Sequence, residues 1–154
     1  MFNRFCNPAF IAILILLVIS CKEEKTEKIV KYPNGTYSKR IPMVNGKKNG
    51  EMLEYFPAGE LKSTSQFIDD RKTGKTVYYY KSGKVRERQF FQNDKLQKGD
   101  TTFYINGNIE SIVEYTNGVK NGYVKKFDST GLMYFNSKYK MDTLVEVNGV
   151  VLQR

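Results

Sequence analysis

The sequence predicts an all-β fold, an elongated antiparallel meander of 24-residue β-hairpin repeats in a single twisted sheet or solenoid. Glycines recur every 24 residues, apolar and polar residues alternate within each interval, and turn dipeptides separate the alternating segments. The recurring glycines are Gly35, Gly59, Gly83, Gly107 and Gly131. Because no stretch after residue 21 has the periodicity of a capped helix, we expect strands throughout the repeats.

Residues 1–20 are predicted to be a secretory signal peptide. One basic residue, Arg4, precedes an uninterrupted apolar run from Ala9 to Ile19. As a helix this run would span roughly 17 Å, which is too short for the ~30 Å hydrocarbon core of a bilayer. An ordinary signal peptide and an uncleaved anchor are the alternatives to the more specific interpretation that follows.

The segment Leu17–Cys21 (LVISC) resembles a bacterial lipobox. The resemblance implies cleavage before Cys21 and acylation of that cysteine. The chain would then be a lipoprotein of the cell envelope that incorporates palmitate. Lys22 follows the cysteine in place of the Asp associated with inner-membrane retention, which favours the outer membrane. The surface and the periplasmic face both remain open. Residues 21–31 are expected to be the lipidated cysteine and a flexible polar tether.

Composition excludes much enzyme chemistry from the mature chain. Cys6 leaves with the signal, Cys21 would be lipidated, and the sequence has no His and no Trp. This excludes zinc sites of Cys or His, imidazole bases and thiol nucleophiles. Without Arg4, 24 Lys and Arg face 16 Asp and Glu, so an anionic partner is expected. Behind a lipobox that partner is an acidic protein, a lipid surface or an envelope polymer, and not nucleic acid.

Each 24-residue unit is predicted to contain two strands and two turns, about ten strands in all. In Gly59–Asp70, Leu61 and Phe67 alternate with polar residues, as in a strand with one buried face. Large apolar residues follow each recurring glycine after eight positions, and a turn column follows three positions later: Gly46, Asp70, Asp94, Gly118 and Asp142. A third column holds Gly50, Gly74 and Gly122, with Gly99 displaced by one. The similar hexapeptides NGKKNG and NGVKNG, at Asn45 and Asn117, are therefore interpreted as turn chemistry and not as a ligand motif.

The repeats are expected over residues 32–142. The period ends after Asp142, and residues 143–154 read as a separate capping hairpin around Asn148-Gly149. A terminal unit of this kind is expected, because the last strand of a repeat array would otherwise present an open edge.

The repeated pattern resembles the MORN-repeat variant family. The residues that carry the resemblance are Tyr55-Phe56-Pro57-Ala58-Gly59 with Leu61, and Tyr79-Tyr80-Lys81-Ser82-Gly83 with Val85. It implies an elongated twisted sheet of hairpins that serves as an interaction scaffold. Bacterial members are often labelled antitoxins of toxin–antitoxin systems, and related repeats in larger proteins are linked to membrane lipids. The lipobox conflicts with a cytosolic antitoxin.

Acidic pairs are the first candidates for chemistry. Asp69-Asp70 falls in the turn columns and Glu23-Glu24 in the tether, and neither has supporting donors or a pocket. No segment has the spacing of a calcium loop with a bidentate Glu. A glycan hydrolase would require a buried carboxylate pair in a concave pocket, and we expect none. No metal or cofactor is expected.

Two sets of repeated residues are candidates for binding. The first is a basic stripe along one edge that faces one way, which either contacts an anionic partner or prevents aggregation of strands. Its members are Lys47, Lys48, Arg71, Lys72, Lys75, Lys95 and Lys120. The second is an aromatic ladder, which either stacks on a ligand or stabilises the sheet. Its members are Tyr55, Tyr79, Phe103, Phe127, Phe67, Phe91, Tyr115 and Tyr139.

These features together predict a non-enzymatic, lipid-anchored repeat protein of the bacterial outer membrane that binds a protein or an envelope polymer. The alternative is an antitoxin or immunity-type protein that neutralises a toxin by direct binding. The sequence does not indicate the oligomeric state.

Overall fold

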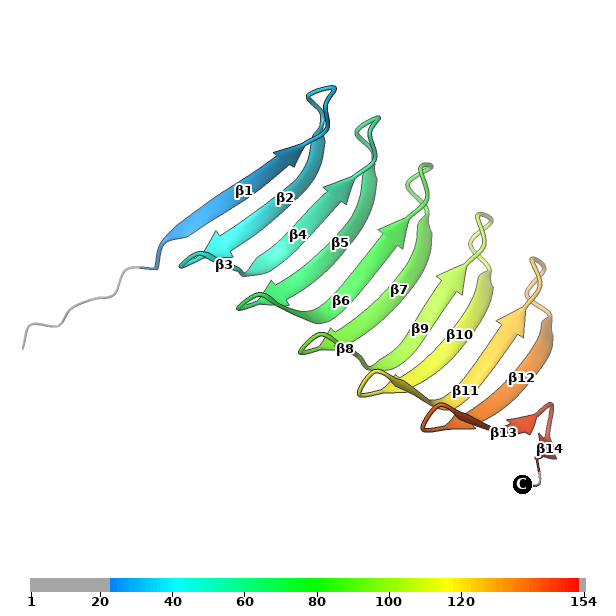
Figure 1. Cartoon of the computed structure of the whole chain (residues 1–154). Helices are drawn as coiled ribbons and strands as arrows, with labels where there is room; N and C mark the ends of the chain where they lie inside the picture. Colours follow the sequence, from blue (N-terminus) through cyan, green and yellow to red (C-terminus); the bar gives the residue numbers. More distant parts are fainter. Residues whose placement is uncertain (1–22, 153–154) are drawn as a thin grey trace, which may run out of the picture.

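The computed structural model describes residues 23–152, which form one open antiparallel sheet of fourteen strands (Figure 1). In chain order the strands are β1 (Lys25–Lys31), β2 (Tyr37–Val44), β3 (Lys47–Lys48), β4 (Gly50–Tyr55), β5 (Leu61–Ile68), β6 (Arg71–Tyr79), β7 (Val85–Gln92), β8 (Lys95–Leu96), β9 (Lys98–Phe103), β10 (Ile109–Thr116), β11 (Val119–Phe127), β12 (Met133–Lys140), β13 (Thr143–Val147) and β14 (Val150–Val151). They follow one another across the sheet in chain order, while the two-residue strands β3 and β8 pair with β2 and β7. The predicted fold class is confirmed.

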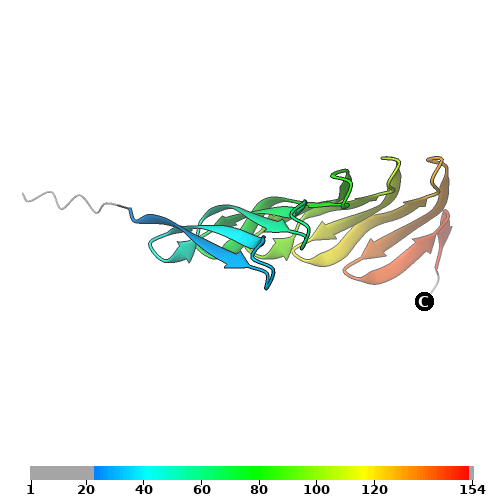
Figure 2. The same ribbon diagram turned by 90° about the horizontal axis from the view of Figure 1, so that it is seen from above.

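The sheet is a single elongated, twisted layer (Figure 2). Each neighbouring pair of long strands is joined by a tight turn, so the contacts between elements are almost all between strands adjacent in the chain. The predicted signal peptide of residues 1–20 and the predicted lipidation site, Cys21, lie outside the described residues. Within residues 23–152 no helix is long and apolar enough to span a membrane.

Type I′ turns close the hairpins at one edge of the sheet. Asn45-Gly46 has φ angles of 49° and 76°, and Asp69-Asp70 has 47° and 67°. Two successive positive φ angles give the twist that matches paired strands, and Asn, Asp and Gly adopt them at low cost. Met141 occupies the first position of the equivalent turn with a φ of 48°. The turn column predicted from the sequence is therefore a column of hairpin turns.

In the third glycine column, the positive φ angle recurs every 24 residues, although the residue type does not. Gly50, Gly74 and Gly122 all have positive φ angles, and 24 residues after Gly74 stands Lys98, with a φ of 61°. Gly99 is not among the positive-φ residues of the described chain. The interpretation of Gly99 as a displaced member of this column was therefore wrong, because the backbone keeps the 24-residue period and places Lys98 in the left-handed region.

Residues 25–31 were expected to belong to a flexible tether, and this was wrong because they form β1. This strand pairs with β2 along its whole length, from Lys25 opposite Val44 to Lys31 opposite Tyr37. Its polar sequence, KTEKIVK, has the composition of a linker. The strand forms because β2 offers a complete row of backbone partners, which a reading of local composition does not detect.

The other end of the sheet is a short hairpin. β13 and β14 meet at Asn148-Gly149, and β13 pairs with residues Ser137 to Lys140 of β12. The backbone amide of Asn148 also donates to the carbonyl oxygen of Asn136 at 2.7 Å. The last edge of the sheet therefore consists of only two strand residues, which suits a terminal unit.

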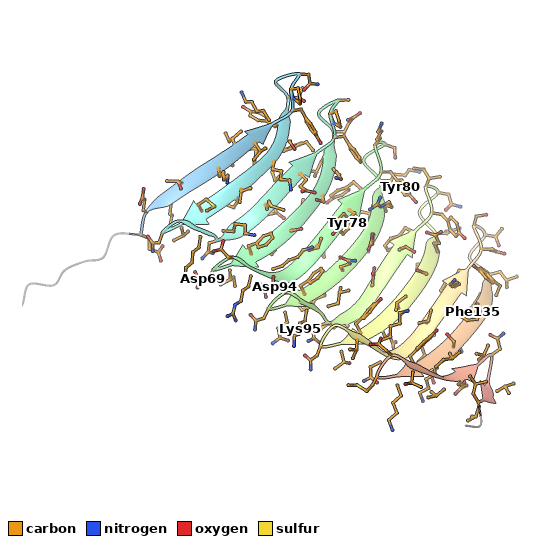
Figure 3. The ribbon with its side chains drawn as sticks, in the orientation of Figure 1. Asp69, Tyr78, Tyr80, Asp94, Lys95 and Phe135 are labelled. Atoms are coloured by element: carbon orange, nitrogen blue, oxygen red, sulfur yellow. The ribbon has the colours of Figure 1, made fainter. Side chains whose placement is uncertain are left out.

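Hydrogen bonds connect successive repeats along both edges of the sheet. At the edge of the type I′ turns, Asp70, Asp94 and Asp142 accept from the backbone amides of Lys48, Lys72 and Lys120 at 2.7–2.8 Å. At the other edge the hydroxyls of Tyr32, Tyr80 and Tyr104 donate to the carbonyl oxygens of Tyr55, Phe103 and Phe127 at 2.6–2.9 Å. Figure 3 shows Asp94 and Tyr80 at these opposite edges.

A single layer leaves little of the sheet fully buried. Ile41, Phe67, Val77 and Val124 are the buried apolar residues of the described chain. The most deeply buried side chains are short and carry hydroxyls: Ser63, Ser65, Thr76 and Ser137. Short side chains in the middle of a face are covered by longer neighbours on adjacent strands, so a sheet without a second layer still excludes water there.

Candidate binding faces

Strand register assigns the side chains to two faces. Ser63 lies opposite Tyr78, Tyr78 opposite Glu87, and Glu87 opposite Thr102. Directly opposed residues of antiparallel strands project to the same side, and consecutive residues project to opposite sides. We name the side that bears Ser63, Ser65 and Phe67 the serine face, and the opposite side, which bears Lys75 and Arg88, the basic face.

The seven residues of the predicted basic stripe divide between these faces. Lys48, Lys72 and Lys120 lie opposite Met43, Phe67 and Tyr115 and belong to the serine face. Lys47, Arg71 and Lys95 lie opposite Val44, Ile68 and Gln92 and belong to the basic face, as does Lys75 opposite Phe90. The expectation of one stripe facing one way was wrong, because neighbours along a strand cannot share a face.

The lysines of the serine face pack on aromatic rings of the following repeat. The Nζ atom lies 4.5 Å from the ring centroid of Phe67 for Lys48, 4.1 Å from that of Phe91 for Lys72, and 5.4 Å from that of Tyr139 for Lys120. Leu96 stands at the corresponding place in the remaining unit. These cation–π contacts hold the ammonium groups against the sheet, so the three lysines contribute to packing between repeats.

The aromatic ladder is also two ladders. Phe67, Phe91, Tyr115 and Tyr139 line the serine face. The other members are Tyr55, Tyr79, Phe103 and Phe127, each of which directly follows a residue of the serine face and projects to the basic face. The guanidinium of Arg88 lies 4.9 Å from the ring centroid of Phe103 on that side. Phe67 is buried, and the other seven rings are half-buried.

A half-buried carboxylate pair lies in the middle of the serine face. Gln89 donates through Nε2 to Glu87 at 2.6 Å and to Asp100 at 3.2 Å. Burial raises the pKa of both carboxyl groups, and the neighbouring Asp100 raises that of Glu87 further. The absence of a buried carboxylate pair in a concave pocket stays a prediction, since this pair is only half-buried. The sequence does not reveal the pair of Glu87 and Asp100, because they lie on different strands, β7 and β9, and only the register brings them together.

Glu54 and Lys72 on this face also have shifted pKa values. Burial alone would raise the pKa of Glu54, but the hydrogen bond and charge of Lys39, 2.7 Å away, together with Ser63, place it below its usual value. Burial lowers the pKa of Lys72, and the charges of Glu54, Glu87 and Asp94 partly oppose this shift. The middle of the serine face is therefore an acidic cluster bordered by lysines. No group of three or more His, Cys, Asp or Glu residues in residues 23–152 is placed to hold a metal ion.

The basic face carries exposed cations from the type I′ turns toward its middle. Lys47, Arg71, Lys75, Arg88 and Lys95 are all exposed, and none of them takes part in the ion pairs found within residues 23–152. A hollow of about 380 Å³ near the type I′ turns is lined by Lys47 and Arg71 together with Ile68, Asp69, Thr73 and Asn93. Figure 3 shows Asp69 and Lys95 along this edge. Unpaired cations at this density produce a positive potential suited to an anionic partner.

The repeats themselves match a known family model. Residues 48–69 and 72–93 match the MORN repeat variant. Both matched MORN repeats begin at a lysine of the serine face and end in the next type I′ turn, so they correspond to β3–β5 and to β6–β7. The match covers two adjacent units of the wider region, residues 32–142, over which the sequence repeats. No curated protein matches the chain.

Proposed function

We propose that this chain is a non-enzymatic, membrane-anchored repeat lipoprotein whose sheet binds a protein or an anionic envelope polymer. The observation that supports a scaffold is the single layer: no second layer covers either face of the sheet within residues 23–152. Half-buried aromatic rings and charged groups on both faces therefore remain accessible. The MORN repeats at 48–69 and 72–93 agree with a role in binding.

The basic face is the proposed contact surface for an anionic partner. Its exposed cations occupy successive repeats, so Lys47, Arg71 and Lys95 are separated by two strand spacings each, about 10 Å. A linear polymer or an acidic protein surface that runs across the strands would meet several of these cations at once. Such binding is expected to weaken as salt screens the charges.

The acidic cluster of the serine face favours the second candidate function, an antitoxin or immunity-type protein. Glu54, Glu87 and Asp100 give this face a negative centre that would suit a basic protein partner. A toxin neutralised in this way would have to meet the chain in the same compartment. The location of the chain is therefore the property to test first.

Metabolic labelling with palmitate and protease shaving of intact cells test the proposed anchor and location. Wild type and Cys6→Ala should incorporate label, and Cys21→Ala should not. Loss of the labelled chain on shaving places it at the surface, and protection places it on the periplasmic side; either result supports an envelope lipoprotein. Absence of label in wild type would overturn the lipoprotein proposal and favour the antitoxin.

Binding through the basic face is tested with a soluble anionic polymer, polygalacturonate, at several salt concentrations. Arg71→Ala should weaken binding several-fold. Lys84→Ala, an equal loss of charge at an exposed position in the turns of the opposite edge, is the matched control and should bind as wild type does. Equal losses for both variants would show that net charge and not this face determines binding.

A further inference from the structure

The first strand, β1, is an open edge of the sheet. All seven of its residues are exposed, and it pairs only with β2 (Figure 1). At the opposite end the last strand has only two residues. A long edge strand presents a row of backbone donors and acceptors to another strand, whereas a very short one does not. The two ends of this sheet therefore differ in their capacity to pair.

The hydrogen-bond pattern shows which backbone groups of β1 are free. The backbone amide of Asn45 donates to the carbonyl oxygen of Glu24 at 2.9 Å, so Glu24 bonds toward β2. Alternation along an antiparallel ladder then directs Thr26, Lys28 and Val30 toward β2 as well. Pro42, which lacks an amide hydrogen, lies opposite Glu27, as this assignment requires. The outward residues are Lys25, Glu27, Ile29 and Lys31.

We propose that β1 pairs antiparallel with β1 of a second copy of this chain, around a two-fold axis that places Ile29 opposite Ile29. In this register Glu27 of each copy lies opposite Lys31 of the other. Val30 lies opposite Lys28, so no like charges are directly opposed. Each outward pair exchanges two backbone hydrogen bonds. The two sheets then continue as one, with both basic faces on the same side.

The charges of β1 favour this register over its neighbours. Pairing around Val30 would place Lys31 opposite Ile29 and would lose both pairs between Glu27 and Lys31. Pairing around Lys28 would oppose the two Lys28 side chains and would place Lys25 opposite Lys31. Pairing around Glu27 would oppose two carboxylates. Like charges directly opposite each other destabilise a strand pair, and opposite charges stabilise it. The lysines of β1 therefore disfavour pairing with most other strands but are compatible with this arrangement of two copies.

Side chains around Ile29 support the same arrangement. Ile29 is 46% exposed and Val30 is 37% exposed, so both lose contact with water when the edges pair. Arg40 lies opposite Ile29 on β2 and holds both carboxylate oxygens of Glu27, at 3.1 and 3.2 Å. This contact keeps the Glu27 carboxylate on the side of the sheet where Lys31 of the second copy would lie.

Cysteine cross-linking tests the register. The full chain with Cys6→Ser and Cys21→Ser, in detergent, has no other cysteine, so one residue at a time is replaced in β1. Ile29→Cys should form a disulfide-linked dimer under mild oxidation, because directly opposed Cα atoms lie within disulfide range. Lys28→Cys and Glu27→Cys should form few disulfide-linked dimers, because residues 28 and 27 of the two copies are not directly opposed. Preferential cross-linking at residue 28 or 27, or equal cross-linking at all three, would overturn the proposed register.

Charge exchange tests the association without cysteines. The dimer dissociation constant from sedimentation should rise roughly tenfold or more for Glu27→Lys and for Lys31→Glu, and the double exchange should recover most of this loss. Glu110→Lys, an exposed residue of an interior strand, is the matched control and should associate as wild type does. A monomeric wild type, or a double exchange no better than the single ones, would refute the dimer. Neither experiment uses the lipid anchor or the polymer, so the result is independent of the proposed function.

Discussion

The hydroxyl of Tyr80 donates a hydrogen bond to the carbonyl oxygen of Phe103, 23 residues later, at 2.6 Å. Tyr32 and Tyr104 make the same contact with their own following repeats. These tyrosines form a column spaced by the 24-residue period. Phe56, 24 residues after Tyr32, belongs to the same column and has no hydroxyl. One junction between repeats therefore lacks a bond that three others possess.

Phe56→Tyr is expected to stabilise the protein, because its hydroxyl would reach the carbonyl oxygen of Tyr79. One hydrogen bond of this kind contributes about 1 kcal/mol to the free energy of unfolding. Tyr80→Phe should lose a similar amount. Urea unfolding measures both, and Phe90→Tyr, outside the column, serves as the control. A destabilised Phe56→Tyr variant would show that the contact does not bridge repeats as described.

Lys98→Gly is also expected to stabilise the protein. Lys98 has a φ of 61° at a position where three other repeats have glycine. A residue with a side chain pays about 1 kcal/mol for the left-handed conformation, and glycine removes this cost from the free energy of unfolding. The loss of the contact between Lys98 and Phe90 reduces the gain. The comparison variant is Lys95→Gly, outside the positive-φ residues, which should lose stability. Thermal unfolding of the two variants should shift in opposite directions.

Asp94→Gly should lose up to about 1 kcal/mol of stability, because the amide of Lys72 would lose its side-chain acceptor at 2.7 Å. Glycine retains the positive φ of this turn position, so the loss reports on the hydrogen bond and not on backbone strain. Asp94→Asn keeps an acceptor oxygen and should stay close to wild type. If the two variants lose equally in denaturant unfolding, charge and not hydrogen bonding is responsible.

The carboxyl groups of Glu87 and Asp100 predict a specific pH dependence. An acid whose pKa is raised in the folded state favours folding below its unfolded pKa, about 4, and loses this contribution as pH rises through the folded pKa. Glu87→Gln or Asp100→Asn should therefore raise stability at neutral pH, by less than about 1 kcal/mol because both groups are partly solvated.

Glu54→Gln should show the opposite behaviour. Its pKa is lowered by Lys39 and Ser63, so the charged form stabilises the fold at neutral pH and this contribution disappears as pH falls through the folded pKa. The variant is expected to lose stability at neutral pH and to match wild type in acid. Denaturant unfolding at a series of pH values separates the two cases. Parallel curves for all three variants would contradict the assigned directions.

The predictions that depended on local chemistry agree with the structure. The recurring glycines, the Asn-Gly and Asp turns and the alternating strands all occur where the 24-residue period places them. Such features are readable because a turn requires particular residues at particular positions, and a half-buried strand requires alternation. The polar segment Lys25–Lys31 was misjudged, because its strand is imposed by β2.

The sequence by itself determined the repeat, the positions of the turns and the all-β class, since these follow from φ preferences and side-chain alternation within one unit. Only the tertiary structure decided which residues share a face. Register separated Lys72 from Arg71, joined Glu87 to Asp100 across two strands, and placed Lys98 in a glycine position. A shift of one residue in strand pairing moves every side chain to the other face, so these relationships depend on pairing between strands and not on any single segment.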